Sequence, residues 1–287
     1  MPHLRAEYYG MLLFGKKFTS REIMFRTENS EAVKRFTDIS AKICPVIIDI
    51  VTSKSKHGDG SLFRLTVPDE SDRLKTLDCF GYSENSVSLH INRANFDDED
   101  CIAHFLRGVF FSCGTVTDPK TGYHLEFSVQ YMNLAYDLCR LISEIHTLGL
   151  EPKIVVRRGN YIVYVKGSEH IADLLTYMGA PVAAMQLMQE KIIKDVRNTA
   201  NRKANSDFYN TNKSVTAAAK QRRAIMLIDK KIGIDNLPDE LAQVARLRLE
   251  NPDMSLKMLA EAVNPPISRS GVNHRITKLM EIAENLH

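Results

Sequence analysis

The sequence predicts an α+β protein with a tandem repeat of helices and strands, a long helical linker and an all-α C-terminal domain. The first observation is an order of helix, strand, helix, strand, strand and helix that occurs twice in residues 1–180. The second is the loss of strand-like patterns after Pro181. The third is a series of apolar residues at helical spacing, interrupted by turn residues, over 235–287. The expected parts are two repeats over about 1–92 and 93–180, a linker over 181–212 and a helical domain over 213–287.

Length and composition exclude several classes of protein. A chain of 287 residues suits two domains, and its balance of apolar and charged residues is that of ordinary globular proteins. No apolar run is long enough to cross a bilayer and the first residues lack a signal-peptide pattern. We therefore expect a cytoplasmic protein without a membrane partner. The five cysteines have no CxxC spacing, so we expect buried thiols rather than disulfides, a metal site or another cofactor.

Each predicted repeat begins with an apolar helix. The first repeat is expected to contain a helix over 3–14, a strand over 22–27, a helix over 30–43, strands over 46–52 and 61–67, and a helix from Pro68. The second is expected to contain a helix over 102–112, a strand over 123–130, a helix over 133–148, strands over 151–157 and 161–166, and a helix over 168–178. Ser30 is the expected N-cap of its helix, and 158–160 is the expected hairpin turn.

The first helices of the two repeats share a glycine. Residues 8–15 are YYGMLLFG and residues 106–114 are LRGVFFSCG, so Gly10 and Gly108 both occupy the third position. Small residues at such positions let two helices approach closely. We interpret the pair as the contact between two half-units, and two unrelated amphipathic helices are the alternative.

Positive charge is concentrated in one segment. The formal net charge is only +3, but 191–231 holds eleven Lys or Arg against three Asp and carries +8, which leaves −5 for the rest. Such asymmetry favours a polyanionic partner, and a solvated basic helix without a partner is the alternative. We expect a helix from 181 to about 207, a break near 209–212 and a second helix over 213–231.

Three short helices are predicted in the C-terminal domain. The first starts at Pro238, which fits the first turn of a helix, and it ends before Pro252. Ser255 is expected to cap the second helix, which 264–266 terminate. Ser268 is expected to cap the third. Helices separated by such tight breaks are typical of a helix-turn-helix.

The third of these helices has one apolar and one polar face. The apolar residues alternate by four and three and are Val272, Ile276, Leu279, Ala283 and Leu286. The opposite face carries hydrogen-bonding side chains with cations at its edges, as expected of a recognition helix in the major groove of DNA. A polar, solvated face without a ligand is the alternative. The residues predicted to bind double-stranded DNA are Lys213, Ser268, Arg269, Ser270, Asn273, His274, Arg275 and Lys278.

Within this set we distinguish two kinds of contact. The side chains expected at base edges are Ser270, Asn273 and His274, because they lie opposite the apolar stripe. The side chains expected at phosphates are Arg269, Arg275 and Lys278.

Three stretches of the sequence carry a family resemblance. They are LPDELAQVARLRLENPDMSLKMLAEAVNPPISRSGVNHRITKLMEIAENL (237–286), DVRNTANRKANSDFYNTNKSVTAAAKQ (195–221) and FLRGVFFSCGTVTDPKTGYHLEF (105–127). These stretches resemble the WhiA family of bacterial regulators. The resemblance implies a LAGLIDADG homing-endonuclease-like fold in the N-terminal part and a helix-turn-helix similar to region 4 of sigma factors. It also implies transcription regulation linked to cell division, chromosome segregation and sporulation. Other transcription regulators or RNA polymerase are further expected partners, at the nucleoid. The family pattern includes an amphipathic segment ahead of the position of Arg5 that this sequence does not contain.

A DNA-cleaving enzyme is the main alternative function. An active LAGLIDADG-type endonuclease holds divalent metal between carboxylates at the ends of its two repeated helices. The corresponding eighth positions are Gly15 and Cys113, and neither is acidic. Asp118 and Glu126 follow in the second repeat without counterparts in the first. We therefore expect a sequence-specific DNA-binding regulator with no catalytic residue and no nuclease activity.

A third hypothesis makes the N-terminal unit a module that binds a protein or a small ligand, because a fold can outlast its chemistry. The exposed face of its sheets distinguishes the hypotheses. A continuous basic face would favour contact with DNA, and an acidic or apolar face would favour another partner.

Overall fold

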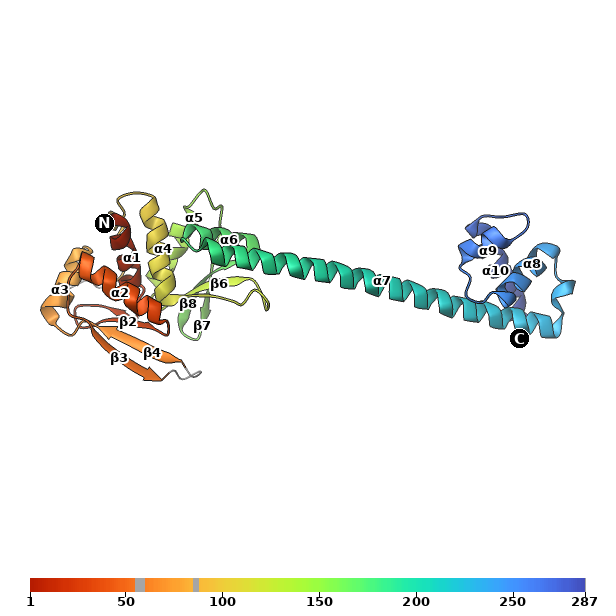
Figure 1. The fold of residues 1–287 in the computed structure, drawn as a ribbon, viewed down its shortest axis with the longest axis horizontal. Coiled ribbons are helices and arrows are strands. Elements are labelled where there is room, and N and C mark those ends of the chain that lie inside the picture. Colours follow the sequence, from red (N-terminus) through yellow and green to blue (C-terminus); the bar gives the residue numbers. More distant parts are fainter. Residues whose placement is uncertain (55–59, 85–87, 287) are drawn as a thin grey trace. The chain divides into compact units, whose positions relative to one another are not determined.

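The computed structural model describes residues 1–54, 60–84 and 88–286 and divides into two compact units, Met1–Lys194 and Asp195–His287 (Figure 1). Each unit has its own apolar core. None of the helices in the described ranges combines the length and the apolar character that a membrane span requires. The division between the units falls inside the segment predicted as a helical linker.

The first unit contains the predicted tandem repeat. The elements of the first repeat are α1 (Pro2–Leu13), β1 (Lys17–Phe18), β2 (Ile23–Thr27), α2 (Ser30–Ile43), β3 (Asp49–Lys54), β4 (Ser61–Thr66) and α3 (Glu70–Cys79). After a 3₁₀ turn, Arg93–Asn95, the elements of the second are α4 (Asp100–Cys113), β5 (Gly114–Val116), β6 (His124–Val129), α5 (Met132–Ser143), β7 (Lys153–Arg157), β8 (Asn160–Lys166) and α6 (Ser168–Tyr177). Each repeat therefore has one strand more than predicted. The additional strands, β1 and β5, are too short to show an alternating pattern.

Each repeat forms a four-stranded antiparallel sheet. The strand order is β1-β2-β4-β3 in the first and β5-β6-β8-β7 in the second, so equivalent strands occupy equivalent places. This confirms the predicted duplication. The hairpin between β7 and β8 turns through Arg158 and Gly159, which both have the positive φ that a two-residue turn of this kind needs. Asn160, predicted in the turn, is instead the first residue of β8 and pairs with Arg157.

Two helices of the first repeat start at different caps from those predicted. The N-cap of α2 is Asn29 rather than Ser30, because the Asn29 side chain accepts a hydrogen bond of 2.9 Å from the backbone N–H two residues on. The helix expected to open at Pro68 begins after Asp69, whose side chain accepts from the backbone N–H of Asp72 at 3.1 Å. Asparagine and aspartate both satisfy the otherwise unpaired N–H groups of a helix start.

Two elements are shorter than the apolar pattern predicts. The strand expected to begin at Val46 begins at Asp49, and the helix expected to reach Leu148 ends at Ser143. Val46 and Leu148 nevertheless pack against the core of the first unit. The apolar pattern extends past the elements because the adjoining loops also cover the core.

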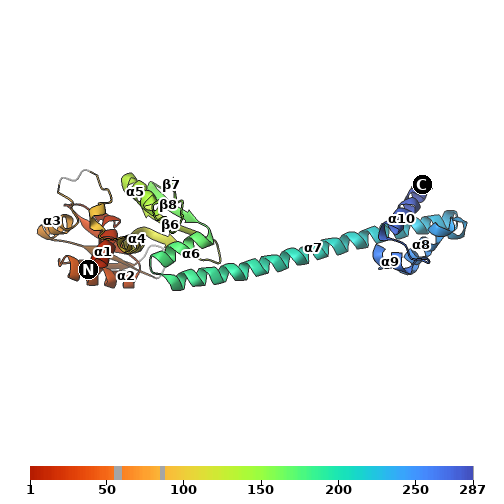
Figure 2. The same cartoon turned by 90° about the horizontal axis from the view of Figure 1, so that it is seen from above.

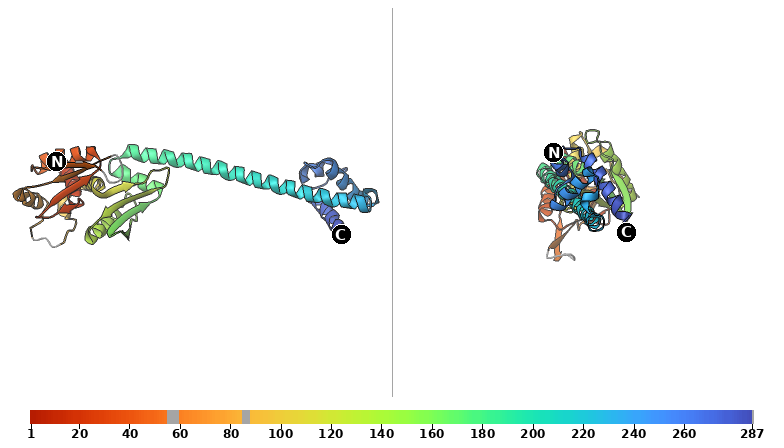
Figure 3. Two further views of the ribbon diagram at one scale, coloured as in Figure 1. Left: turned by 90° about the horizontal axis from the view of Figure 1, so that it is seen from below. Right: turned by 90° about the vertical axis from the view of Figure 1, so that its right-hand side faces the viewer.

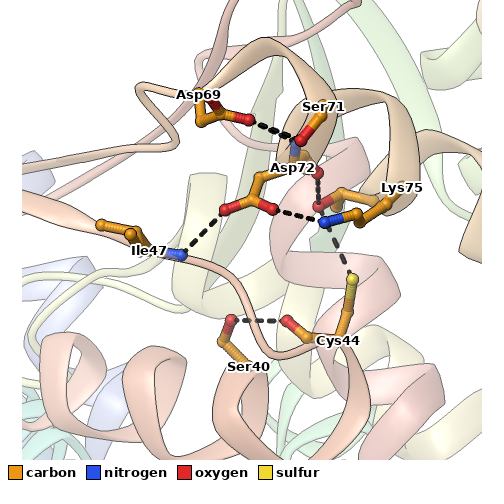
Figure 4. Close-up of polar contacts among 8 residues, drawn as sticks. Ser40, Cys44, Ile47, Asp69, Ser71, Asp72 and Lys75 are labelled. Carbon is orange, nitrogen blue, oxygen red and sulfur yellow. Dashed lines mark hydrogen bonds and ion pairs between the residues drawn. The ribbon is translucent and has the colours of Figure 1, made fainter.

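Polar contacts hold the loop after α2 against the start of α3 (Figure 4). The backbone N–H of Ile47 donates to the Asp72 carboxylate at 3.3 Å, and the same carboxylate accepts from Lys75 Nζ at 3.1 Å. Cys44 Sγ lies 3.7 Å from Thr76 Oγ1. The Ile47 N–H thus has a partner outside the sheet, which agrees with the late start of β3.

The two repeats meet through α1 and α4, which lie side by side (Figures 1 and 2). A Cβ atom on Gly10 would lie 2.3 Å from the carbonyl oxygen of Phe105, and one on Gly108 would lie 2.0 Å from that of Glu7. Only glycine leaves room for backbone at these distances. Ser112 of α4 also donates a hydrogen bond of 2.9 Å to a backbone carbonyl of α1. The predicted close approach of the two glycine-bearing helices is confirmed.

A buried carboxylate joins the same pair of helices to α2. The Glu7 side chain is fully buried and accepts hydrogen bonds from Arg35 at 2.7 and 2.8 Å and from Arg107 at 2.6 Å. Burial alone raises the pKa of Glu7, but the hydrogen bonds from the two guanidinium groups outweigh it and hold this pKa below its ordinary value. The ionised carboxylate therefore stabilises the fold above the pKa of an unfolded glutamate. This contribution is lost as the pH falls through the lower, folded-state pKa.

The second unit consists of helices packed on the end of α7 (Figure 3). Its elements are α7 (Pro181–Lys231, which begins in the first unit), a 3₁₀ turn (Ile234–Asn236), α8 (Asp239–Glu250), α9 (Leu256–Ala262) and α10 (Arg269–Glu284). Ile225 and Ile228 of α7 are buried together with Val244, Leu259 and Val272 of the three short helices. The three helices predicted at the C-terminal end are confirmed.

The predicted break in the linker is wrong. α7 is one continuous helix through 209–212 (Figure 3). No glycine or proline occurs between Pro181 and Gly233. Asparagine lowers helix propensity by less than about 1 kcal/mol relative to alanine, so the asparagines of this segment do not end the helix.

Replacement of Gly108 by alanine tests the contact between the repeats. In an ordinary helix this change stabilises by about 1 kcal/mol. Here the new Cβ would lie 2.0 Å from a backbone oxygen of α1. We therefore expect the free energy of unfolding of the first unit to fall by about 3 kcal/mol in denaturant titrations. Gly122→Ala is the control, because its Cβ would meet nothing within 4 Å. Equal effects of the two substitutions would contradict the close approach.

Candidate nucleic-acid interface

α10 has one buried and one exposed face, as predicted. Its buried residues are Val272, Ile276, Leu279 and Ala283, whereas Leu286, predicted in the same stripe, lies beyond the end of the helix and is half-buried. Its exposed polar residues are Arg269, Ser270, Asn273, His274, Thr277 and Lys278. A helix anchored by four buried apolar residues presents its opposite side chains in fixed directions, which recognition of a DNA groove requires.

Serines cap the second and third short helices, as predicted. The Ser255 hydroxyl accepts a hydrogen bond from the Met258 N–H at 3.3 Å. The Ser268 hydroxyl accepts from the Gly271 N–H at 3.1 Å and lies 2.9 Å from the Ser270 hydroxyl. Ser268, one of the predicted DNA-binding residues, is therefore engaged in starting the helix.

The middle of the exposed face is available to a ligand. Within the described residues, the side chains of Asn273, His274 and Lys278 make no hydrogen bond or ion pair to the rest of the protein. The Thr277 hydroxyl donates to the backbone carbonyl of Asn273 at 2.9 Å. An amide, an imidazole and an ammonium group thus lie close together with donors and acceptors unused.

Arg275 lies differently from the other predicted cations. Its side chain is only 19% exposed, and its Nη2 lies 3.1 Å from Oε2 of Glu240 on α8. This ion pair joins α10 to α8 and covers part of the guanidinium. A helical wheel places Arg275 at the flank of the polar face, but it does not show the carboxylate that the neighbouring helix brings there.

Lys213 and Arg269 lie at one groove of about 600 Å³ in the second unit. The groove is lined by α7 together with Arg248 of α8, the start of α9 and the start of α10. Lys257, on α9, lines it too and was not among the predicted residues. The only sequence signal for Lys257 is a single positive charge on a short helix, and its place beside Arg269 follows from packing alone.

The positions equivalent to catalytic acids lie together but hold no carboxylate. Gly15 and Cys113, at the ends of α1 and α4, line one cavity of about 310 Å³. Lys16 and Arg26 line it as well, and among the described residues Glu28 is the only acid of this lining. A pair of divalent ions needs several carboxylate ligands, and two cations beside one carboxylate do not supply them.

Residues of metal-ligand type gather elsewhere in the described part of the chain. His3, Asp98 and Cys101 can place one ligand atom each within 4.8 Å of one another. They lie at the opposite end of α1 from Gly15. This group was not predicted.

The exposed faces of the two sheets mix cations with apolar residues. The outward cations are Lys17, Arg26, Arg64, Lys153, Arg157 and Lys166, and the outward acids are Asp49 and Glu126. Glu126 Oε2 lies 2.9 Å from His124 and 3.4 Å from Arg157. Exposed Val51 and Val155 lie on the same faces. The faces carry excess positive charge, but it is not continuous.

Comparison with known proteins places both parts of the chain in one family. The model of the WhiA LAGLIDADG-like domain matches residues 102–197, and that of the WhiA C-terminal HTH domain matches residues 200–283. A probable cell division protein WhiA from Clostridium perfringens is 36% identical over 283 residues, covering 94% of this chain and 87% of that protein. A protein of the same name from Staphylococcus haemolyticus is 36% identical over 268 residues, covering 92% and 84%.

A solved structure has the same fold. The crystal structure of full-length DUF199/WhiA from Thermatoga maritima aligns with a TM-score of 0.55 at 22% identity and covers 99% of this chain and 92% of that one. The chain is therefore a two-unit protein, with a LAGLIDADG-like unit and a helix-turn-helix unit. It belongs to the WhiA family. The predicted fold class and the family resemblance are confirmed.

Substitution of Ser268 tests whether this residue acts through the start of α10. Ser268→Ala removes the acceptor of the Gly271 N–H, so we expect the free energy of unfolding of the second unit to fall by about 1 kcal/mol. Ser268→Asp keeps a capping oxygen and should retain most of this stability. Differential scanning calorimetry measures both variants. The assignment fails if alanine and aspartate destabilise the unit equally.

Proposed function

We propose that this protein is a sequence-specific DNA-binding transcription regulator that acts in cell division, chromosome segregation or sporulation. The exposed face of α10 supports this best, because Asn273 and His274 lie there without an internal partner among the described residues. Arg269 and Lys278 flank them. Amide and imidazole side chains can contact base edges in the major groove, and flanking cations contact phosphates. The name of the relatives, probable cell division protein, supports the cellular process.

The predicted residues take two kinds of role in this proposal. Those that contact DNA directly are Lys213, Arg269, Ser270, Asn273, His274 and Lys278. Ser268 and Arg275 act mainly from within the protein, the first as helix cap and the second through its ion pair with Glu240. The orientation of α10 toward DNA therefore depends on contacts with α8 as well as on the buried stripe.

The first unit serves in this proposal without cleaving DNA. Gly15 and Cys113 cannot ligate divalent metal as carboxylates do, and Lys16 and Arg26 disfavour a cation between them. Other regulators or RNA polymerase would meet the protein at the nucleoid on surfaces that DNA leaves free.

Replacing Asn273 and Lys278 separately distinguishes contact with bases from contact with phosphates. Asn273→Ala should lose about 1–3 kcal/mol of binding free energy on the preferred site and little on scrambled duplexes. Lys278→Ala should weaken both duplexes about equally and reduce the salt dependence by roughly one unit of slope. Fluorescence anisotropy at several salt concentrations measures both effects.

Asn198→Ala, at an exposed position of α7, is the matched control for loss of a surface amide. It should change neither affinity. If Asn273→Ala lowers the affinity for specific and scrambled duplexes by the same factor, α10 does not distinguish sequences.

The purified full-length protein should leave plasmid and genomic DNA intact in the presence of Mg²⁺. The reason is the lack of acids at Gly15 and Cys113. Gel electrophoresis of the DNA after prolonged incubation measures cleavage, with an active restriction endonuclease as the positive control. Reproducible, metal-dependent double-strand cuts at a defined site would show that the alternative, an active endonuclease, is right.

A further inference from the structure

The groove at the start of α10 carries positive charge on every side. Among its lining residues are Lys213 of α7, Lys257 of α9, Arg269 of α10 and Arg248 of α8. Its lining in the described chain includes no carboxylate. Lys213, Lys257 and Arg269 are exposed, whereas Arg248 is only 2% exposed. The groove therefore has a cationic rim and a buried cation on its inner side.

Arg248 lacks a counter-ion among the described residues. Its Nη1 donates to the backbone carbonyl of Met254 at 2.6 Å and lies 3.4 Å from that of Pro252. Its Nε–H is buried and has no hydrogen-bond partner within the described residues. Burial lowers the pKa of the Arg248 guanidinium, because water is removed from the charge and no anion replaces it. A buried charge without a partner is costly, so the site favours an incoming anion.

A buried charge in the first unit provides a comparison with Arg248. The buried Glu7 carboxylate accepts hydrogen bonds from two arginines, Arg35 and Arg107. Arg248 has no equivalent partner, although its burial is nearly as complete. A second polar atom of the same groove, Gln221 Oε1, is also buried and has no hydrogen-bond partner in the described part of the chain.

We propose that this groove is a binding site for a phosphate group. Arg248 would donate to the phosphate from the inner side, and Lys213, Lys257 and Arg269 would surround it at the rim. The planar guanidinium matches the oxygen geometry of a phosphate, and the three surrounding cations match its charge. No acidic residue of the described lining opposes the anion.

Two sources can supply this phosphate. Arg269 is the first residue of α10, so a backbone phosphate beside the DNA groove that α10 contacts is the first source. In that case the inference rests on the proposed function and adds Arg248 and Lys257 to the residues that contact DNA. The second source is a free phosphorylated small molecule, which would make the groove a ligand site next to the recognition helix.

Nuclear magnetic resonance of the full-length protein tests the site directly. The buried Nε–H of Arg248 should give its own signal, which Arg248→Lys identifies by its loss. Titration with inorganic phosphate at constant ionic strength should shift this signal saturably, and chloride should not. If chloride shifts it equally, or if phosphate does not shift it, the groove is not a phosphate site.

Lys257→Gln and Lys230→Gln give a matched pair that does not depend on folding of an Arg248 variant. Each removes one exposed positive charge from the second unit, but only Lys257 lines the groove. Lys257→Gln should weaken phosphate binding by about tenfold, as expected for loss of one charge-assisted hydrogen bond. Lys230→Gln should leave it unchanged. Equal effects of the two substitutions would mean that phosphate binds through non-specific electrostatic attraction, and this result would overturn the proposal.

A specific duplex distinguishes the two sources. If the duplex displaces inorganic phosphate from Arg248, the site takes a backbone phosphate of DNA. If phosphate binds with the same affinity while the duplex is bound, the site takes a free phosphorylated ligand. If phosphate never binds while the duplex still binds in a manner that depends on Asn273, the phosphate site is refuted and the proposed function stands.

Discussion

The backbone contact between α1 and α4 is the constraint on which the first unit depends. At Gly10 and Gly108 a carbonyl oxygen of each helix occupies the space that a side chain of the other would need. Glu7 lies one helical turn from Gly10, is buried, and accepts hydrogen bonds from Arg35 of α2 and Arg107 of α4. These contacts connect α2 to the helix pair. Strands of both sheets contact this helix pair, and the two repeats have equivalent strand orders.

The same helix pair has the close packing of a LAGLIDADG-like fold but lacks the acids that cleavage of DNA requires. In a LAGLIDADG-type endonuclease the ends of these helices also carry the acids for divalent metal, and here those ends are Gly15 and Cys113. The close packing persists because Gly10 and Gly108 lie in the middle of the interface and do not depend on the residues at its end. In the proposed function the side chains that contact bases lie instead on the second unit, where Asn273 and His274 are exposed. In the proposed function, recognition of DNA is therefore assigned to the second unit, and the helix pair of the first unit has a structural role.

Sequence reasoning predicted best where a local pattern has one physical meaning. The spacing of Gly10 and Gly108 predicted the helix contact, and the capping serine Ser268 predicted the start of α10. It failed where the local pattern is too short or too weak to decide. The strands β1 and β5 are too short for periodicity, and the break expected near 209–212 relied on asparagines without a glycine or proline.

The candidate interface was predicted only in part, because some of its contacts depend on packing between helices. The buried stripe on α10 determines which side chains face outward, so Asn273, His274 and Lys278 could be placed from the sequence alone. The partner of Arg275 could not, because Glu240 comes from another helix. Arg248 gave no signal at all, since a single arginine in an amphipathic helix is usually solvated. The loop after α8 accepts its hydrogen bonds, and α7 and α9 line the groove beside it, so its burial depends on tertiary packing.

The central claim is that affinity for DNA resides in the second unit. Its own apolar core indicates that the fragment 195–287 folds alone, and the same holds for the fragment 1–194. The most direct measurement is the affinity of each fragment and of the full chain for the preferred duplex over a range of salt concentrations. We predict that 195–287 binds with a strong salt dependence close to that of the full chain, because its cations release the counter-ions of the phosphates. Failure of 195–287 to bind, together with binding of the duplex by 1–194 alone, would show that the affinity for DNA does not reside in the second unit.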